Sequence, residues 1–443
     1  MSIALYAVAI GGALLLVLSL VQQRRRKSLL PPGPPGDPVV GHFLRIPSAD
    51  SPLVFHQWSK IYGPVMHLKV LGRSMVILDT YQAAVDLLDK KGSIYSDRPK
   101  FTLYELVGWK PSISFLQYGK QFHTQRQMHQ TYLSRHKVED FKPMQIQEAR
   151  TLVRNLLEST PERYEKFLSR FATGIITQIV AGHRITSDAD PYLRMSNMVY
   201  EAISNTGPPG SSPLDFFPLL QHFPPWFPGA KHEAGVATPS FILRQLEQMK
   251  EGEDVEELKG AAATMFGAGE STTWSTLCIF ILAMILHPEW QETAQKEIDS
   301  IVGNMRLPEF GDRADLPFVE GILQETLRGM SLDENVYSNP TSFNPQRYLP
   351  KPAGNGEPNF TNVSFGFGRR ICTGQYLADN SLWIAIVSIL ATCRITNMMD
   401  ESGKIIVPES SLTDGLVSHP RDIRCIICPR STGTKELIME TVV

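Results

Sequence analysis

The pattern of hydrophobic and polar positions predicts one short hairpin followed by many helices. Residues 66–71 and 74–78 alternate between apolar and polar types and are rich in β-branched side chains, which predicts two strands turning at Gly72-Arg73. Apolar residues then recur with helical spacing over most of the chain. The clearest of these stretches are residues 81–90, 148–157 and 255–286. We therefore expect a mainly α-helical α+β fold with a few small sheets.

The N-terminus begins with an uncharged apolar run, residues 3–21. As a helix this run would span about 28 Å, close to the thickness of a membrane's hydrocarbon core. Four basic residues at 24–27 follow it, so the positive-inside rule leaves the rest of the chain cytosolic. A cleaved signal peptide is the alternative, but its charges would precede the apolar run. Residues 1–30 are predicted to be a single-pass anchor with a basic stop.

A proline-rich segment, residues 31–38, separates this anchor from the remainder of the chain. Proline fixes φ and removes an amide donor, so the segment is predicted to be a stiff, extended spacer. A ligand for a module that binds polyproline helices is the alternative. No further linker or internal repeat follows, so residues 31–443 are predicted to form one domain.

Composition narrows the function classes. Of the 443 residues, 42% are hydrophobic and 20% are charged, which allows a large core. The net charge of −2 gives no reason to expect a nucleic-acid partner. Five cysteines without framework spacing argue against a disulfide scaffold. Cys425 and Cys428 form an isolated pair, which we interpret as lying on alternate sides of a strand and not as a zinc site.

One short segment, residues 365–374, combines residue types that suit a bound metal cofactor. Gly366 and Gly368 let the backbone turn tightly and approach a flat ligand. Arg369 and Arg370 are suited to binding carboxylates in a fixed fork geometry. A cysteine beside cations at a helix N-terminus has a stabilised thiolate, so Cys372 is a candidate metal ligand. A glycine-rich turn with a buried free cysteine is the alternative.

This segment resembles the haem-binding signature Phe-x-x-Gly-x-Arg-x-Cys-x-Gly of the cytochrome P450 superfamily, the haem-thiolate monooxygenases. All five fixed positions are matched, by Phe365, Gly368, Arg370, Cys372 and Gly374. The resemblance implies the family's fold, in which haem b lies between a long distal helix and a proximal cysteine loop. It makes Cys372 the iron ligand, whose thiolate promotes O–O cleavage. Gly366 also belongs to the implied haem-binding loop, and Arg370 to the contacts of a haem propionate.

A second resemblance concerns residues 118–126. They are similar to a helix of the family in which a tryptophan and an arginine, four residues apart, hold a haem propionate. Phe122 stands at the tryptophan position and Arg126 at the arginine position. Phenylalanine has no N–H, so one propionate hydrogen bond is lost and Arg126 is implied to keep the other. A solvated surface arginine is the alternative. His129 and His136 lie two helical turns apart, about 10 Å, too far to share a metal ion.

The longest helical pattern contains two glycines, Gly267 and Gly269, which together cost about 1–2 kcal/mol in a helix. Residues 266–273 resemble the family's distal-helix motif Ala/Gly-Gly-x-Asp/Glu-Thr-Thr/Ser, where the helix opens over the haem to form an oxygen pocket. The resemblance gives Thr272 the hydroxyl that stabilises bound oxygen and relays protons. A threonine hydroxyl bonded back to a helix carbonyl is the alternative.

The motif departs from the family at its acid, where Ser271 replaces Asp or Glu. Glu270 comes one residue earlier, about 100° around the helix, and cannot simply replace that acid. Thr272, Ser271 and Glu270 are thus the candidate catalytic residues. We expect weaker coupling of electron uptake to product formation, which Ser271→Asp would change.

Two further stretches resemble structural parts of the family. Glu325-x-x-Arg328 and the segment 343–348, which contains Arg347, match the motifs of a charged network behind the haem. This network has no direct role in the chemistry. Residues 415–420 and 423–427 predict a loop and a strand, and the resemblance makes the loop a wall of the substrate pocket.

The chain is shorter than the family at two junctions, residues 226–260 and 328–343. The first junction leaves no room for the long helix that roofs the substrate cavity. The second omits strands that line the pocket and a loop with a further propionate contact. Losing strands from a sheet exposes apolar surface and unpaired backbone groups.

The leading hypothesis is a haem-dependent monooxygenase of the microsomal class, anchored in the endoplasmic reticulum membrane. It would take electrons from NADPH through a flavoprotein reductase and insert one atom of O₂ into an apolar small molecule. Residues 261–274 and 345–350 look most like fungal enzymes of the O-methylsterigmatocystin oxidoreductase type, which implies secondary or xenobiotic metabolism. One alternative is an impaired haem-binding or non-catalytic membrane-anchored remnant. Another is a thiol or zinc module built on Cys425 and Cys428.

Overall fold

The computed structural model of the chain describes residues 30–47, 50–106, 108–161, 163–206, 212–222, 255–328, 331–359, 361–409, 411–413, 416–421 and 423–441. The chain divides into two compact units, Met1–Asp86 and Leu87–Val443. The predicted N-terminal anchor lies outside the described residues, except for Leu30. The helix-rich α+β fold expected from the sequence is confirmed.

The first unit contains a small two-stranded sheet. Its elements are η1 (Phe43–Arg45), α2 (Ser51–Tyr62), β1 (Val65–Val70), β2 (Arg73–Leu78) and α3 (Tyr81–Ala84). The strands pair antiparallel with Val70 opposite Arg73. The turn therefore consists of Leu71 and Gly72, at φ values of 47° and 88°, one position earlier than predicted. Positive φ at both residues is the type I′ arrangement that suits two-residue hairpins, and glycine at the second position adopts it without steric cost.

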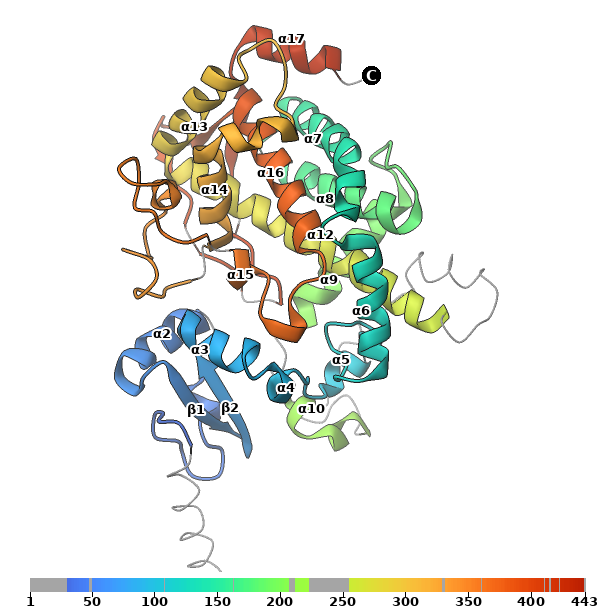
Figure 1. Cartoon of the computed structure of the whole chain (residues 1–443), viewed down its shortest axis with the longest axis vertical. Helices are drawn as coiled ribbons and strands as arrows, with labels where there is room; N and C mark the ends of the chain where they lie inside the picture. Colours follow the sequence, from blue (N-terminus) through green and yellow to red (C-terminus); the bar gives the residue numbers. More distant parts are fainter. Residues whose placement is uncertain are drawn as a thin grey trace, which may run out of the picture. The chain divides into compact units, whose positions relative to one another are not determined.

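The second unit is mostly helical (Figure 1). After η2 (Val85–Asp89), its first half contains α4 (Gly92–Tyr95), α5 (Thr102–Leu106), α6 (Lys120–Leu133), η3 (Lys137–Phe141), α7 (Lys142–Leu157), α8 (Tyr164–Ala181), α9 (Pro191–Thr206), α10 (Pro213–Phe216) and η4 (Pro218–His222). Its second half contains α12 (Val255–Leu286), α13 (Pro288–Ile301), η5 (Phe310–Asp315), α14 (Pro317–Arg328), η6 (Pro345–Tyr348), α15 (Thr361–Ser364), η7 (Gly368–Arg370), α16 (Gln375–Thr392), β3 (Cys393–Met399), β4 (Ile405–Ile406), β5 (Cys425–Pro429) and α17 (Thr432–Thr441).

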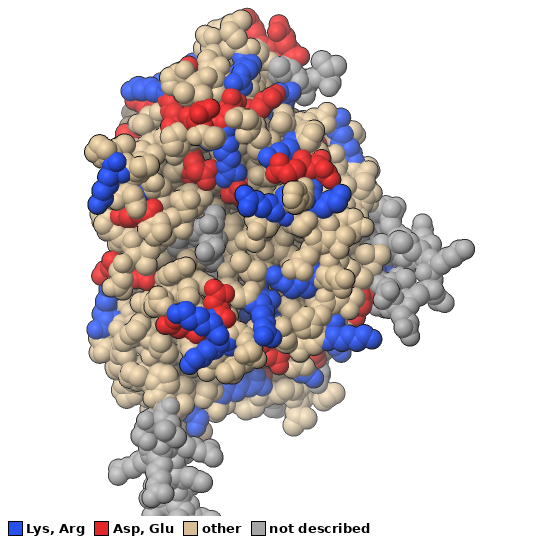
Figure 2. Space-filling view, viewed as in Figure 1, with Lys and Arg blue, Asp and Glu red and all other residues tan. Residues whose placement is uncertain are grey.

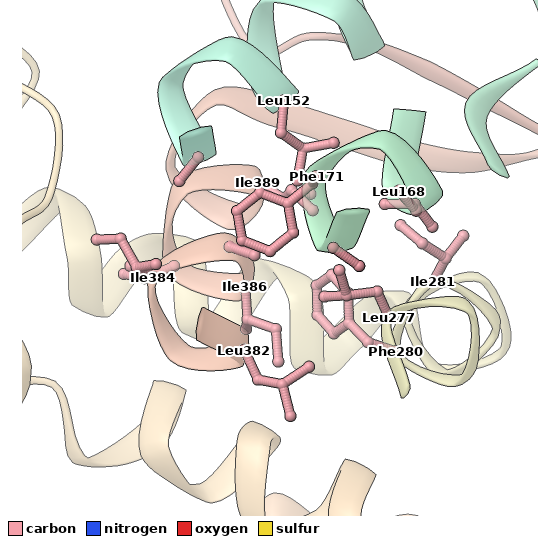
Figure 3. Packing of buried hydrophobic residues seen from close by; sticks show 14 of the residues in the cluster. Leu152, Leu168, Phe171, Leu277, Phe280, Ile281, Leu382, Ile384, Ile386 and Ile389 are labelled. Atoms are coloured by element: carbon pink, nitrogen blue, oxygen red, sulfur yellow. The ribbon is translucent and has the colours of Figure 1, made fainter. Parts of the chain in front are cut away.

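The core of this unit forms where α12 and α16 pack against α7 and α8. Figure 3 shows side chains of these four helices converging, among them Phe171 of α8, Phe280 of α12 and Ile386 of α16. Both α12 and α16 are apolar on nearly every side, which is typical of a helix buried in a large protein. Each large apolar side chain buried here contributes about 1.5–3 kcal/mol. The core thereby fixes α12, the helix that carries the predicted catalytic residues.

Helix α12 also passes a test for membrane-spanning helices by its length and composition. Within the described residues it is the one helix that does, over Glu257–Leu286, but 72% of its most apolar stretch is buried inside the protein. Burial of that extent identifies α12 as a core helix.

A three-stranded sheet completes the second unit, with β3 between β4 and β5. Cys425 is buried on one face of β5, and Cys428 lies on the other face opposite Arg394. The predicted strand with alternating cysteines is therefore confirmed. No group of three or more His, Cys, Asp or Glu side chains that could hold a metal ion occurs among the residues that the structure describes. On the face drawn in Figure 2, acidic and basic side chains are interspersed.

Candidate active site

The segment that carries Cys372 forms a tight loop between α15 and α16. The Cys372 amide donates to the Phe365 carbonyl oxygen at 2.8 Å, which closes the loop. Gly366 and Gly368 have φ values of 80° and 56°, which glycine adopts without steric cost. A Cβ on Gly368 would also overlap the Leu88 carbonyl oxygen. Both glycines thus have the backbone role that the sequence predicts.

The Cys372 thiol reaches solvent at the N-terminus of α16. Protein atoms nevertheless surround it on most sides, and this burial raises the pKa of the thiol. The Gly374 backbone N–H, which donates to the sulfur, and the nearby Arg126 oppose that rise only in part. The helix N-terminus and Arg126 thus act on the thiolate in the expected direction, but desolvation is the larger effect. A metal ion bound to the sulfur would stabilise the thiolate.

Arg126 and Arg370 both bind carbonyl oxygens around this loop. Arg126 Nη1 donates to the Ile371 carbonyl oxygen at 2.7 Å, and its side chain is half-buried. Arg126 is therefore not the solvated surface arginine considered as its alternative. Arg370 donates to three carbonyl oxygens at 2.7, 3.3 and 2.9 Å, those of Ser96, Ile113 and Leu116.

Phe122, at the position where the family motif has tryptophan, supports Arg370. The Arg370 guanidinium carbon lies 3.9 Å from the centroid of the Phe122 ring, and Phe122 is buried. A desolvated cation–π contact of this kind contributes on the order of 2 kcal/mol. Phe122 thus lacks the hydrogen bond that a tryptophan could make, but its ring stacks on Arg370 and holds that side chain in place.

A third arginine, Arg98, belongs to the same cationic group. Burial lowers the pKa of Arg98, of Arg126 and of Arg370, the last to about 10. Arg98 and Arg126 each repel Arg370, which lowers its pKa further. Asp97 is a carboxylate that offsets this repulsion at Arg370. The sequence analysis missed Arg98 because it lies in a loop without periodicity.

This gathering of guanidinium groups suits a ligand with negative charges. Arg126 beside a solvent-reaching thiol, with Arg370 in the same loop and Arg98 near Arg370, suits the two propionates and the iron of haem. The residues present therefore fit a haem, because they offer a sulfur that can bind iron and guanidinium groups that can pair with propionates.

Helix α12 runs without interruption from Val255 to Leu286, so the opening expected over Gly267–Thr273 is absent from it. The two glycines serve close packing instead. A Cβ on Gly267 would lie 3.3 Å from the Trp109 ring, and one on Gly269 would lie 3.0 Å from Ile176 of α8. The penalty for glycine in this helix is therefore offset by the close approach of neighbouring side chains.

Thr272 is exposed, whereas the adjacent Ser271 and Thr273 are buried. Its hydroxyl donates to the Ala268 carbonyl oxygen at 2.7 Å, and the Ser271 hydroxyl donates to the Gly267 carbonyl oxygen at 2.7 Å. Both side chains thus make the back-bond considered as the alternative. This bond uses only the hydroxyl hydrogen, so the exposed Thr272 oxygen can still accept a hydrogen bond.

Glu270 lies about 200° around α12 from Thr272. The Ser169 hydroxyl on α8 donates to Glu270 Oε1 at 3.1 Å, and Ser196 of α9 adds a second hydrogen bond. The carboxyl is 2% exposed, and among the described atoms its Oε2 has no hydrogen-bond partner. Burial raises the pKa of Glu270 to about 7, and the two serines oppose this rise only in part. Glu270 therefore joins α12 to α8 and α9 as a carboxyl that is largely protonated below neutral pH.

Replacing Glu270 by glutamine makes the protein more stable in alkaline solution only. Between pH 4.5 and about 7 the folded protein holds a proton that the unfolded chain releases, so stability falls as pH rises through this range. Above pH 7 the folded protein bears the full cost of ionising this buried carboxyl, roughly 3 kcal/mol. We expect Glu270→Gln to raise the free energy of unfolding in urea by about 2–3 kcal/mol at pH 8 and by little at pH 5. The exposed Glu292→Gln is the control, and equal gains at both pH values would contradict the assignment.

The predicted network of Glu325, Arg328 and Arg347 is present. Both arginines donate to the Glu325 carboxylate, at 2.6 and 2.9 Å from Arg328 and at 3.0 Å from Arg347. All three side chains are buried. Arg328 also donates to the carbonyl oxygens of Ser331 and Pro340, each at 2.8 Å, so it organises the short connection after α14.

The C-terminal loop contacts α12. Its described part includes Ser418, whose carbonyl oxygen accepts from the Ser275 hydroxyl at 2.5 Å. The following residue, His419, bonds Tyr200 of α9 at 3.1 Å. Residue 415 of the predicted loop lies outside the described residues. The loop thus joins the distal helix to α9, and its role as a pocket wall stays a prediction.

Comparison with known proteins gives consistent matches over most of the chain. The family model described as cytochrome P450 matches residues 31–254, 231–331 and 329–426. Cytochrome P450 monooxygenase 136 of Postia placenta is 33% identical over 93% of this chain and 90% of its own length. Cytochrome P450 monooxygenase claR of Ampulloclitocybe clavipes is 33% identical over 92% of this chain and 88% of its own length. A cytochrome P450 monooxygenase of Armillaria gallica is 32% identical over 97% of both chains.

These matches also bear on the length of the chain. The family model matches in three pieces that meet at residues 231–254 and 329–331. The alignment with the Postia placenta relative is 482 positions long, more than the 443 residues of this chain. That relative therefore has segments without a counterpart here. The relatives are fungal, and these names state no substrate.

Proposed function

The chain belongs to the cytochrome P450 family and is a haem-thiolate monooxygenase, and we propose that Cys372, Thr272 and a group of arginines form its reaction centre. Haem, when bound, supplies the activation of O₂ and the transfer of one oxygen atom to the substrate. The observation that supports this centre is the closed loop of residues 365–374, which presents a solvent-reaching sulfur beside Arg126 and Arg370.

Each residue of the centre has a separate task. Cys372 binds the iron through its sulfur, and the Gly374 N–H holds that sulfur in place. Phe365 and Gly366 shape the loop, and Arg126 and Arg370 neutralise the propionates. A propionate would replace carbonyl oxygens as the acceptor of part of their hydrogen bonds, with a gain in strength because both partners are charged.

Thr272 is the proton relay of this centre. Its hydroxyl is exposed, and its oxygen can accept a hydrogen bond from a proton-carrying group. As a relay, Thr272 would pass on its own hydrogen, now bonded to the Ala268 carbonyl oxygen, as it takes up another. Ser271 is buried and bonded in the same way, which leaves it a supporting group. Its replacement by aspartate stays our prediction for improved coupling of electron uptake to product formation.

Removing the Thr272 hydroxyl lowers coupling. We expect Thr272→Ala to lower the amount of product formed per O₂ consumed by about tenfold. This loss is smaller than the full rate contribution of a positioned proton donor, because water replaces part of the relay. Peroxide release rises by the matching share. Oxygen uptake, peroxide and product are measured together on the haem-loaded enzyme. Thr272→Ser is the control that keeps the hydroxyl, and unchanged coupling in Thr272→Ala would contradict the role.

The electrons come from NADPH through a flavoprotein reductase, and the substrate is an apolar small molecule of fungal secondary or xenobiotic metabolism. Residues 1–30 anchor the enzyme in the endoplasmic reticulum membrane with the catalytic domain cytosolic. The uncharged run at residues 3–21 and the basic residues after it support this topology. Removing residues 1–29 should move the protein from the alkali-resistant membrane fraction to the soluble fraction.

The test of this function uses the full chain, purified with haem and mixed with an NADPH-dependent flavoprotein reductase. The reduced protein is titrated with carbon monoxide, and an alkoxycoumarin is supplied as an apolar probe. A thiolate-type Soret band with NADPH-dependent dealkylation supports the proposal. A protonated-thiol band without product under the same conditions would support the impaired remnant instead.

A further inference from the structure

Helix α6 contacts the residues on both sides of Cys372. Arg126 Nη1 donates to the carbonyl oxygen of Ile371, the residue before the cysteine, at 2.7 Å. His129 Nδ1 lies 3.1 Å from the hydroxyl of Thr373, the residue after it. Positions 126 and 129 are three residues apart and so share one face of α6. The sulfur is therefore carried by a short segment that α6 holds at two points.

His129 also bonds the distal helix. Its Nε2 lies 3.0 Å from the carbonyl oxygen of Ala261 on α12. A carbonyl can only accept, so Nε2 carries a hydrogen, and in the neutral ring Nδ1 then accepts from the Thr373 hydroxyl. His129 is 2% exposed, and Ala261 is equally buried. The imidazole thus forms one buried bridge from α12 through α6 to the cysteine loop.

We propose that His129 is a positioning residue that fixes the Cys372 sulfur relative to the distal helix. The inference rests on the proposed role of Cys372 as the iron ligand and assigns His129 a function beyond it. Without the imidazole, the Thr373 hydroxyl and the Ala261 carbonyl lose a buried partner, and the C-terminal side of the cysteine loop is released. Outer partners that orient metal ligands typically change metal affinity about 10–100-fold when replaced.

The first test replaces His129 in the full, haem-loaded chain. We expect His129→Leu to release haem to an excess of apomyoglobin about tenfold faster than the unmodified protein. A larger share of the reduced protein also shows the protonated-thiol band with carbon monoxide. Both proteins are compared at equal folded fraction. If neither the rate of haem transfer nor the shape of the band differed from the unmodified protein, the proposal would be overturned.

Two conservative variants separate the two bonds of the bridge. Asparagine places its amide near the Nδ1 position and can keep the bond to Thr373, whereas glutamine reaches the Nε2 position and can keep the bond to Ala261. If the contact with the cysteine loop is what positions the sulfur, His129→Asn retains the thiolate band better than His129→Gln. The opposite order would show that the bond to α12 alone matters and would overturn the proposal.

A matched control distinguishes positioning from general loss of stability. Gln125 is also buried on α6, and its amide donates to Pro111 and to Glu257 of α12 at 2.8 and 3.0 Å. Gln125→Leu therefore removes buried bonds between α6 and α12 without touching the cysteine loop. We expect it to lower the melting temperature and to leave the carbon-monoxide band unchanged. An equal loss of the thiolate band in Gln125→Leu would reduce His129 to a structural residue.

Variants of Thr373 test the other end of the bridge. Thr373→Val removes the hydroxyl that His129 accepts from, while Thr373→Ser keeps it. The double variant His129→Leu with Thr373→Val should release haem no faster than the faster single variant, since both remove one link. If the unmodified protein binds no haem through a thiolate, the proposed function fails. If it does and these variants behave independently, the inference alone fails.

Discussion

Replacing Cys372 by serine abolishes the thiolate-type Soret band and the NADPH-dependent turnover of this enzyme. A serine hydroxyl is not ionised near neutral pH and does not supply the electron density that promotes O–O cleavage. We expect product formation to fall by about a thousandfold or more, which corresponds to about 4 kcal/mol in the reaction barrier. The measurements are the reduced carbon-monoxide spectrum, the haem content and product formation with the reductase.

Cys428→Ser is the matched control, since Cys428 is a partly exposed cysteine on β5, outside the loop of residues 365–374. It should leave pigment and turnover as they are. If Cys372→Ser retained both pigment and turnover, the sulfur would not be the iron ligand and the proposed reaction centre would be wrong.

Replacing Glu325 by glutamine should cause the largest loss of stability from a single buried charge. The carboxylate is fully buried and receives two arginines that are themselves buried, Arg328 and Arg347. The amide keeps the shape but leaves two guanidinium groups without their shared negative charge. Removing one partner from a buried ion pair typically costs about 3–5 kcal/mol. The free energy of unfolding in urea, followed by circular dichroism, measures this loss.

The exposed pair of Lys137 and Asp140 provides the comparison, because both side chains are more than half exposed, at 59% and 66%. Asp140→Asn should change the free energy of unfolding by less than about 1 kcal/mol. A loss in Glu325→Gln as small as this would mean that the network adds little to stability in this chain.

The network also bears on the short connection after α14. Arg328 reaches two carbonyl oxygens in residues 331–340, and Arg347 donates to Glu357 at 2.8 Å. The backbone of this connection is therefore tied to buried charges that the family motif already supplies. The family model likewise has two of its matched pieces meeting at residues 329–331, at the start of this connection.

Much of this enzyme follows from local sequence. The extent of α12, the hairpin at the start of the chain and the strand with Cys425 and Cys428 come from periodicity, which depends on the side chains within each element. The cysteine loop comes from glycines that need positive φ at positions 366 and 368. These features are local, so neighbouring residues determine them.

The partners of each functional side chain depend instead on chain segments far apart in sequence. Gly267 and Gly269 suggested an opened helix, but Trp109 and Ile176 lie against them and explain both glycines. The Cys372 thiol has a raised pKa because burial, which no local pattern reveals, exceeds the effect of its helix and of Arg126.

The sequence by itself determined the family and the long distal helix and predicted the iron ligand, since each is carried by a contiguous motif. Only the tertiary structure decided that Glu270 bonds α8, that Phe122 stacks on Arg370 and that His129 joins the cysteine loop to Ala261. The physical reason is that hydrogen bonds and desolvation act over a few ångströms in space. Packing of the core brings those groups together, whatever their distance along the chain.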